Sequence, residues 1–172
     1  ALSPEPVWLW TIDASRILWA NPTGAAIFNG ETPNALSEQL FEPQHPAAMQ
    51  IGRLAGTLPQ GGTPRLERLR GFGASLGGAL VCLCSRITLS DNSAAVLVVS
   101  TERAGNDLAL PERARRFLAD IDQPAAVFSA DGELVEAKPQ AADRLAHGRD
   151  LTALNAAGLA REAALNGQSI GD

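Results

Sequence analysis

The sequence predicts an α+β fold, in which an antiparallel five-stranded sheet carries its helices on one side and a truncated second copy follows. Strand-like segments fall into a pair near the start and three in succession at 65–101, with helix-like segments between the two groups. This order is typical of domains whose helices cover one face of an antiparallel sheet. The opening pattern at 6–28 also returns at 124–145, which predicts the second copy.

The first two strands are predicted at Val7–Ile12 and Ile17–Trp19. Both segments are rich in β-branched and aromatic residues, and they flank a polar turn at Asp13, so a hairpin is expected. Asn21 then stands directly before Pro22, a pairing typical of an N-cap and a first helical residue. A short Ala-rich helix is expected to follow.

Residues 31–62 predict short helices separated by Pro and Gly. One helix is expected at Ala35–Phe41 and ends before a proline. The longest is expected at Pro46–Leu58, because apolar residues recur there at helical spacing. The residues available for its apolar stripe are Met49, Ile51, Leu54 and Leu58.

Three consecutive strands are predicted at Arg65–Phe72, Ala79–Leu89 and Ala94–Thr101. In the middle strand the alternation places Cys82 and Cys84 on one face. These are the only cysteines of the chain, and their placement in one strand suits a reducing compartment. We expect both thiols to be buried and inert.

The segments Pro6–Phe28 and Pro124–Leu145 share one plan. Each begins with Pro and an apolar stretch, and each reaches an Asp at a matching place, Asp13 and Asp131. A short turn, a second extended run, a Pro and an Ala-rich helix start then follow in both. A repeat of this length is too long for a solenoid unit and predicts two copies of a small domain.

The expected organisation is a first domain at 1–104, a connector helix at 105–122 and the N-terminal part of a truncated second domain at 123–172. Because the second copy lacks its three closing strands, we expect the chain to be part of a longer protein. The connector has one apolar face at helical spacing. That face either packs on its own chain, or acts as a lever that moves or pairs with a partner chain. Its residues are Ala114, Phe117, Leu118 and Ile121.

Charge and composition exclude several classes of function. The chain carries 14 basic and 19 acidic residues, and this formal net charge of −5 argues against a nucleic-acid partner. No apolar stretch reaches the roughly 18 residues that span a bilayer, so we expect no membrane contact and a cytoplasmic location. With 5% aromatic residues and no Tyr, a mostly aliphatic core is expected.

No constellation of catalytic or metal-binding residues is found in the sequence. A metal site needs three or four convergent ligands, and a Ser or Cys nucleophile needs a neighbouring base. The two histidines lie in separate copies, away from the cysteines. We therefore expect no catalytic residue, no metal and no enzyme activity in this chain.

The opening of the chain resembles the PAS sensor family, through an apolar strand, Asp13, a short turn, a second strand and the Asn21-Pro22 helix start. The end of the first domain, VVSTER at 98–103, is similar to the family's usual Asp-Ile-Thr ending followed by Glu and Arg. Val99 and Ser100 depart from that pattern. The resemblance implies structural roles for Asp13, Asn21 and Asp131. Its candidates for signal transmission are Thr101, Glu102, Arg103, Phe117, Leu118 and Ile121.

The resemblance also implies an intracellular sensory module, most similar to the regulatory region of a bacterial two-component histidine kinase. Such a region acts through conformational change driven by a ligand or partner, as a homodimer joined to its own downstream output domain. One alternative is the sensor of a cyclic-dinucleotide enzyme or transcription regulator, and another is a small α+β hydrolase or lyase.

The cofactors of such sensors are not expected here. The flavin-binding type needs a Cys in a helix, and the haem-binding type needs a His on the long helix, within Met49–Leu58. This chain has neither. A small apolar ligand between the helices and the sheet is left open.

Overall fold

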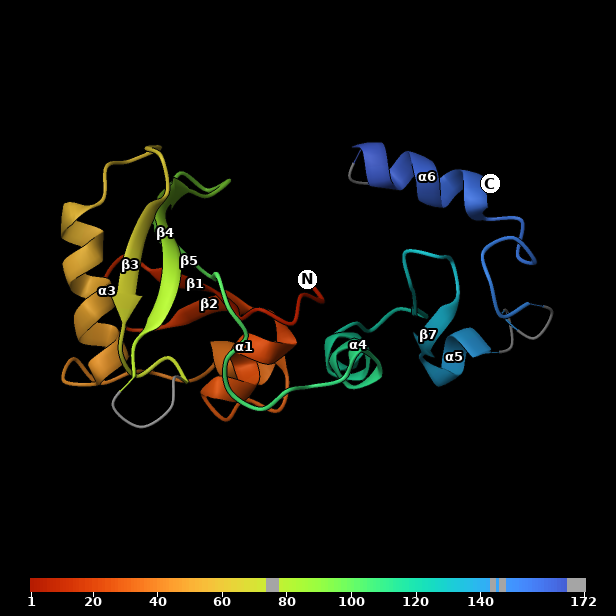
Figure 1. The fold of residues 1–172 in the computed structure, drawn as a ribbon, viewed down its shortest axis with the longest axis horizontal. Coiled ribbons are helices and arrows are strands. Elements are labelled where there is room, and N and C mark those ends of the chain that lie inside the picture. Colours follow the sequence, from red (N-terminus) through yellow and green to blue (C-terminus); the bar gives the residue numbers. More distant parts are fainter. Residues whose placement is uncertain (74–77, 143–144, 146–147, 167–172) are drawn as a thin grey trace. The chain divides into compact units, whose positions relative to one another are not determined.

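The computed structural model describes residues 1–73, 78–142, 145 and 148–166 (Figure 1). The chain divides into two compact units, unit 1 at Ala1–Asp120 and unit 2 at Ile121–Asp172. The boundary falls within the connector expected at 105–122, and the helix found there, Leu110–Ala119, belongs to unit 1.

Unit 1 contains the expected antiparallel sheet of five strands, and their order in the sheet is β2-β1-β5-β4-β3. The opening hairpin therefore lies beside the last strand, and β1 and β5 are neighbours at the middle of the sheet. The strands are β1 (Val7–Thr11), β2 (Ile17–Ala20), β3 (Arg65–Leu69), β4 (Leu80–Thr88) and β5 (Ala94–Ser100).

Each helix of unit 1 has a proline in its first turn. Proline lacks a backbone N–H, but a residue at this position would make no intrahelical hydrogen bond through that group. In the first three helices the preceding side chain accepts a hydrogen bond from a backbone N–H, and these N-caps are Asn21, Thr32 and His45. The helices are α1 (Pro22–Ile27), α2 (Pro33–Ser37), α3 (Pro46–Thr57) and α4 (Leu110–Ala119).

The helix expected at Ala35–Phe41 is α2, which begins and ends earlier than predicted. Thr32 caps it by accepting from the N–H of Ala35, which sets the earlier start. Its end is set by tertiary structure, because the N–H of Phe41 donates to the carbonyl of Ser15 at 2.9 Å, at the turn of the opening hairpin.

The long helix α3 was predicted almost to the residue, but one member of its expected stripe was wrong. Ile51, Leu54 and Leu58 are buried against the sheet, whereas Met49 is 61% exposed. Met49 lies two residues before Ile51, about 200° away around the helix, and so it faces outward. Alanines, including Ala47, complete the buried face instead.

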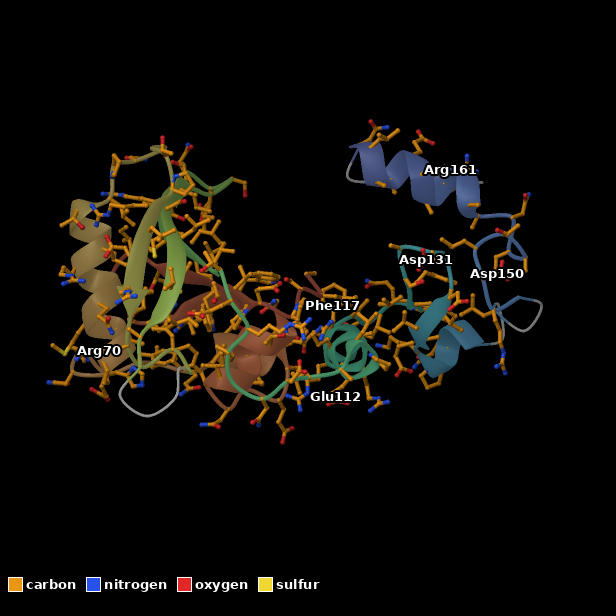
Figure 2. The ribbon with its side chains drawn as sticks, viewed as in Figure 1. Arg70, Glu112, Phe117, Asp131, Asp150 and Arg161 are labelled. Carbon is orange, nitrogen blue, oxygen red and sulfur yellow. The ribbon has the colours of Figure 1, made fainter. Side chains whose placement is uncertain are left out.

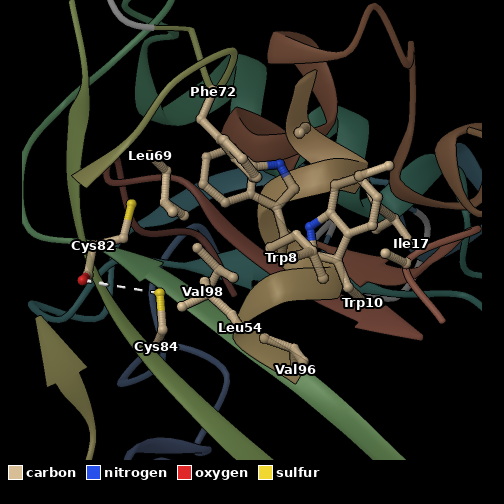
Figure 3. Packing of buried hydrophobic residues seen from close by; sticks show 14 of the residues in the cluster. Trp8, Trp10, Ile17, Leu54, Leu69, Phe72, Cys82, Cys84, Val96 and Val98 are labelled. Carbon is tan, nitrogen blue, oxygen red and sulfur yellow. Dashed lines mark hydrogen bonds between the residues drawn. The ribbon is translucent and has the colours of Figure 1, made fainter. Parts of the chain in front are cut away.

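Most of the buried core residues of unit 1 are aliphatic, as expected, and a cluster of aromatic rings lies among them (Figure 3). Trp8 packs on Phe72 with a centroid distance of 5.1 Å, and Trp10 packs on Phe41 at 4.7 Å. Phe28 lies within 6 Å of both tryptophans. These rings fill the space between the helices and the sheet.

The described residues of unit 2 form a two-stranded antiparallel sheet and two helices. Its hairpin has the register of the hairpin in unit 1, including a register shift at the same point. The strands are β6 (Ala126–Phe128) and β7 (Leu134–Ala137), and the helices are α5 (Pro139–Ala142) and α6 (Ala157–Asn166). The pair Trp8–Ala20 of unit 1 corresponds to Ala126–Ala137 of unit 2. In the same way, Leu9–Trp19 corresponds to Val127–Glu136, and Trp10–Ile17 corresponds to Phe128–Leu134.

Candidate functional site

The two faces of the unit 1 sheet differ in exposure, because the helices cover only one of them. On the covered face Trp8, Trp10, Val96 and Val98 have no exposed surface. Of the residues that alternate with them in β1 and β5, Ala95 is buried, whereas the others are only half-buried. The opposite face is thus left uncovered by the helices of its own unit.

This uncovered face is apolar. One cross-strand row runs over four strands, and a second row lies beside it over three, as the strand registers require. Trp19 is 37% exposed, Leu83 36% and Leu66 63%. We call this surface the open face, defined by Val7, Val99, Leu83 and Leu66 in one row and Trp19, Leu9 and Leu97 in the other.

Charged side chains are absent from both rows of the open face. Ser85 continues the second row into β4, since it pairs with Leu97. The nearest strand position that carries a charge on this face is Arg68, which pairs with Val81 at the margin. Contiguous exposed apolar surface is typical of interaction sites, so the open face is the candidate functional site of unit 1.

Asn21 joins three segments at one end of the sheet. Its side chain, 1% exposed, accepts hydrogen bonds from the N–H groups of Val7 at 3.1 Å and Gly24 at 2.8 Å. The same amide donates to the carbonyls of Ser3 at 3.1 Å and Glu5 at 2.8 Å. Asn21 therefore fixes the first strand and the first residues of the chain to the start of α1.

The aspartates of the two hairpin turns lie at corresponding places but make different contacts. Asp13 accepts from the Thr11 hydroxyl at 2.5 Å and from the Ser15 N–H at 3.1 Å, and these bonds lower the pKa of its carboxyl. Asp131 is exposed in its turn. There the Ser129 hydroxyl accepts a hydrogen bond from the backbone N–H of Glu133 at 3.2 Å.

The end of β5 is tied to the start of β4. The hydroxyl of Thr101 donates to the carbonyl of Val81 at 3.0 Å, and Glu102 accepts from the N–H of the same residue at 3.2 Å. Arg103 instead forms an exposed ion pair with Asp107 at 3.7 Å. Such an exposed ion pair contributes little to stability. Thr101 and Glu102 are therefore the residues that hold the end of β5 against β4.

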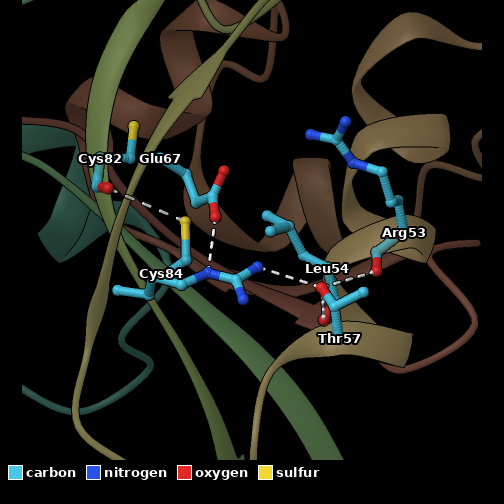
Figure 4. A network of polar contacts seen from close by, with 7 residues as sticks. Arg53, Leu54, Thr57, Glu67, Cys82 and Cys84 are labelled. Carbon is cyan, nitrogen blue, oxygen red and sulfur yellow. Dashed lines mark hydrogen bonds and ion pairs between the residues drawn. The ribbon is translucent and has the colours of Figure 1, made fainter.

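Both cysteines are buried on the covered face. Burial raises the pKa of each thiol to about 12, and the nearby Glu67 carboxylate adds to this effect at Cys84. That carboxylate is held by the guanidinium of Arg65, which also donates to the Thr57 hydroxyl at 3.0 Å (Figure 4). The thiols are therefore protonated and unreactive at neutral pH.

Helix α4 packs on its own unit, against α1. Ala114 and Leu118 are buried, and Phe117 is half-buried. The exposed side carries Glu112, whose pKa is lowered by its hydrogen bond to Arg116; Figure 2 labels this glutamate and Phe117. The expected apolar face is divided between the units, because Ile121 belongs to unit 2.

The sequence reasoning missed the open face and the anchoring of α4. The signal for the open face was present, since β1 and β5 read as near-continuous apolar runs, the pattern of strands shielded on both faces. The anchors of α4 are Arg113 and Asp120. They contact segments far away in the sequence, and no local pattern marks them.

A comparison of the chain with family models, curated proteins and solved structures found no match. Within the described ranges, no helix is long and apolar enough to cross a membrane. The same residues contain no group of three or more His, Cys, Asp and Glu side chains that could hold a metal ion.

Proposed function

We propose that this chain is the sensory and interaction region of a cytoplasmic signalling protein, and that it acts as a homodimer. Unit 1 is proposed as a PAS-type domain, and the parent protein as a two-component histidine kinase with its output domain elsewhere. The chain would act by a shift between two packings, with no chemical turnover of its own.

The open face carries this proposal. Seven apolar side chains form two adjacent rows on a sheet face that the unit's helices leave uncovered. A second copy is the occupant that fits best. Because the rows carry no formal charge, no like charges meet at the contact between two copies, although each chain has a net charge of −5. A two-fold arrangement would place the same patch on both partners.

The filled interior supports a protein partner over a small ligand. The aromatic rings of Trp8, Trp10 and Phe72 occupy the space between the helices and the sheet, where a ligand of such a domain would otherwise lie. Trp8 also donates its indole N–H to the carbonyl of Gly24 at 2.9 Å. A bound ligand would have to displace rings that have no exposed surface.

The proposal that unit 2 begins a second copy has its own support. In unit 1 the chain returns to the hairpin turn, where Phe41 donates to the carbonyl of Ser15. In unit 2 Leu151 donates in the same way to the carbonyl of Gly132, at 2.9 Å. Together with the shared strand register, this bond reproduces the long-range contact of the first hairpin.

Sedimentation equilibrium of the purified chain tests the proposal. We expect a monomer–dimer equilibrium that the variant Leu97→Glu weakens at least about 100-fold, because a carboxylate would be buried without a partner at the centre of the interface. The matched control is Met49→Glu, which adds the same charge on the helical side of unit 1. This control should leave the equilibrium unchanged.

Two outcomes would overturn the proposal. One is a chain that remains monomeric at all accessible concentrations. The other is a dimer that Leu97→Glu and Met49→Glu weaken equally, which would locate the contact elsewhere. Urea unfolding followed by tryptophan fluorescence establishes that each variant is folded, since a lost dimer has meaning only for a folded unit 1.

A further inference from the structure

The first residues of the chain lie between α4 and the sheet of unit 1. The carbonyl of Leu2 accepts from Nε of Arg113 at 2.9 Å, an arginine in the first half of α4. One residue later, the carbonyl of Ser3 accepts from Asn21 at 3.1 Å and from the Thr23 hydroxyl at 3.2 Å. We call residues 2–5 the strap, because they connect the helix to the end of the sheet.

Helix α4 is fixed near both of its ends. Near its start Arg113 also donates through Nη1 to the carbonyl of Leu108. One guanidinium therefore binds both the strap, at Leu2, and the segment that precedes the helix, at Leu108. Directly after its last residue, the carboxylate of Asp120 accepts from the N–H of Asn34 in α2 at 2.8 Å. Between these anchors the helix buries Ala114 and Leu118.

The helix depends on these contacts to stay folded. It has ten residues, and its N-cap residue Ala109 provides no side-chain hydrogen bond. An isolated helix of this length is marginal in water, because nucleation is costly and few hydrogen bonds follow it. Loss of the anchors should therefore release and unfold α4, while the sheet, with its own core, stays intact.

We propose that the strap is a latch that holds α4 docked, so that displacement of the strap by an event at the start of the chain or at the sheet releases the connector. The inference rests on the proposed function, because it assigns α4 as the route of the signal. Asn21 is the link, since it binds the strap and also the N–H of Val7, whose side chain begins the first row of the open face.

Hydrogen exchange of the full chain tests the latch. In Arg113→Gln the amides of 110–120 should exchange roughly tenfold faster, because the charge-assisted bonds to two carbonyls are lost, while the amides of β4 and β5 keep their protection. The matched control is Arg115→Gln, which removes the same charge from the same helix at a side chain that is 66% exposed. Its exchange rates should change less than about threefold.

A second variant removes the strap and leaves the arginine in place. Deletion of residues 1–3 takes away the carbonyls of Leu2 and Ser3, and it should release α4 to the same extent as Arg113→Gln. Unchanged protection of 110–120 in both variants would overturn the proposal. An equal loss of protection in β4 and β5 would also overturn it, because the contacts would then contribute only to overall stability.

The exchange is measured at a protein concentration at which sedimentation shows the monomer. A failed latch and a failed homodimer are then separate results, because exchange in α4 of the monomer does not depend on the open face. The measurement is repeated at a concentration that favours the dimer. Exchange in α4 should differ between the two concentrations, and identical exchange would contradict the coupling of the latch to the open face.

Discussion

Replacement of Asn21 by alanine is expected to destabilise unit 1 strongly. The side chain makes four hydrogen bonds while 1% exposed, and it is the N-cap of α1. Loss of the cap costs about 1 kcal/mol. Each of the other three bonds contributes about 1 kcal/mol, and partners left buried without water would add to this. We expect a loss of about 3–4 kcal/mol in the free energy of unfolding, a large part of the stability of a small domain.

Urea unfolding followed by tryptophan fluorescence measures this change. All three tryptophans of the chain lie in unit 1, so the signal reports that unit alone. The matched control is Asn34→Ala, the same substitution at an exposed position of α2. Since alanine favours a helix, the control should change the free energy of unfolding by less than about 0.5 kcal/mol.

The reasoning would be refuted by a loss below about 1 kcal/mol for Asn21→Ala, the value of an ordinary exposed N-cap. Such a result would mean that water replaces the amide at Val7, Ser3 and Glu5. Asn21 would then stabilise only the start of α1. Its hydrogen bonds to the strap and to Val7 would contribute no net stability, and the proposed link between the strap and the sheet would be unsupported.

Two further predictions concern glycines and cysteines. Gly24→Ala should lower the free energy of unfolding by about 1–3 kcal/mol, because the new Cβ would lie 2.7 Å from the carbonyl oxygen of Val7. Gly52→Ala, in open space on α3, should raise it by up to about 1 kcal/mol in the same urea assay. Cys82 and Cys84 should resist a thiol reagent until the chain is unfolded, and two fast-reacting thiols in the native state would contradict their burial. Because their pKa values rise from 9.0 in the ordinary thiol to about 12 on folding, the contribution of the two thiols to stability should be constant below pH 9 and fall as the pH rises toward 12. A Cys82→Ala, Cys84→Ala double variant should lose this alkaline decline.

Local patterns were sufficient to predict most elements of unit 1. The hairpin around Asp13, the long helix from Pro46 and the three later strands follow from β-branched runs, helical spacing and prolines at helix starts. The early end of α2 could not be predicted, because it depends on a bond from Phe41 to Ser15, which is distant in the sequence. The outward position of Met49 follows from helix geometry, and the three buried stripe residues alone would have indicated it.

The candidate surface was harder to predict than the elements. Alternation in β4 separates Cys82 from Leu83 but does not say which face the helices cover. The structure shows that the cysteine face is covered and the leucine face is open. The contact between Arg113 and Leu2 joins residues at opposite ends of unit 1, and it depends on how α4 packs rather than on any motif.

Site-directed cross-linking tests the central claim, that the open face pairs with a second copy, most directly. Ser85→Cys places a reactive thiol within the second row of that face, and Met49→Cys places one on α3 as the control. The native cysteines are buried and should not interfere. We predict that a short bismaleimide will link two copies of the Ser85→Cys variant in high yield and will not link the control. Efficient linking of the control alone, or of neither variant at concentrations where the chain is dimeric, would contradict the account.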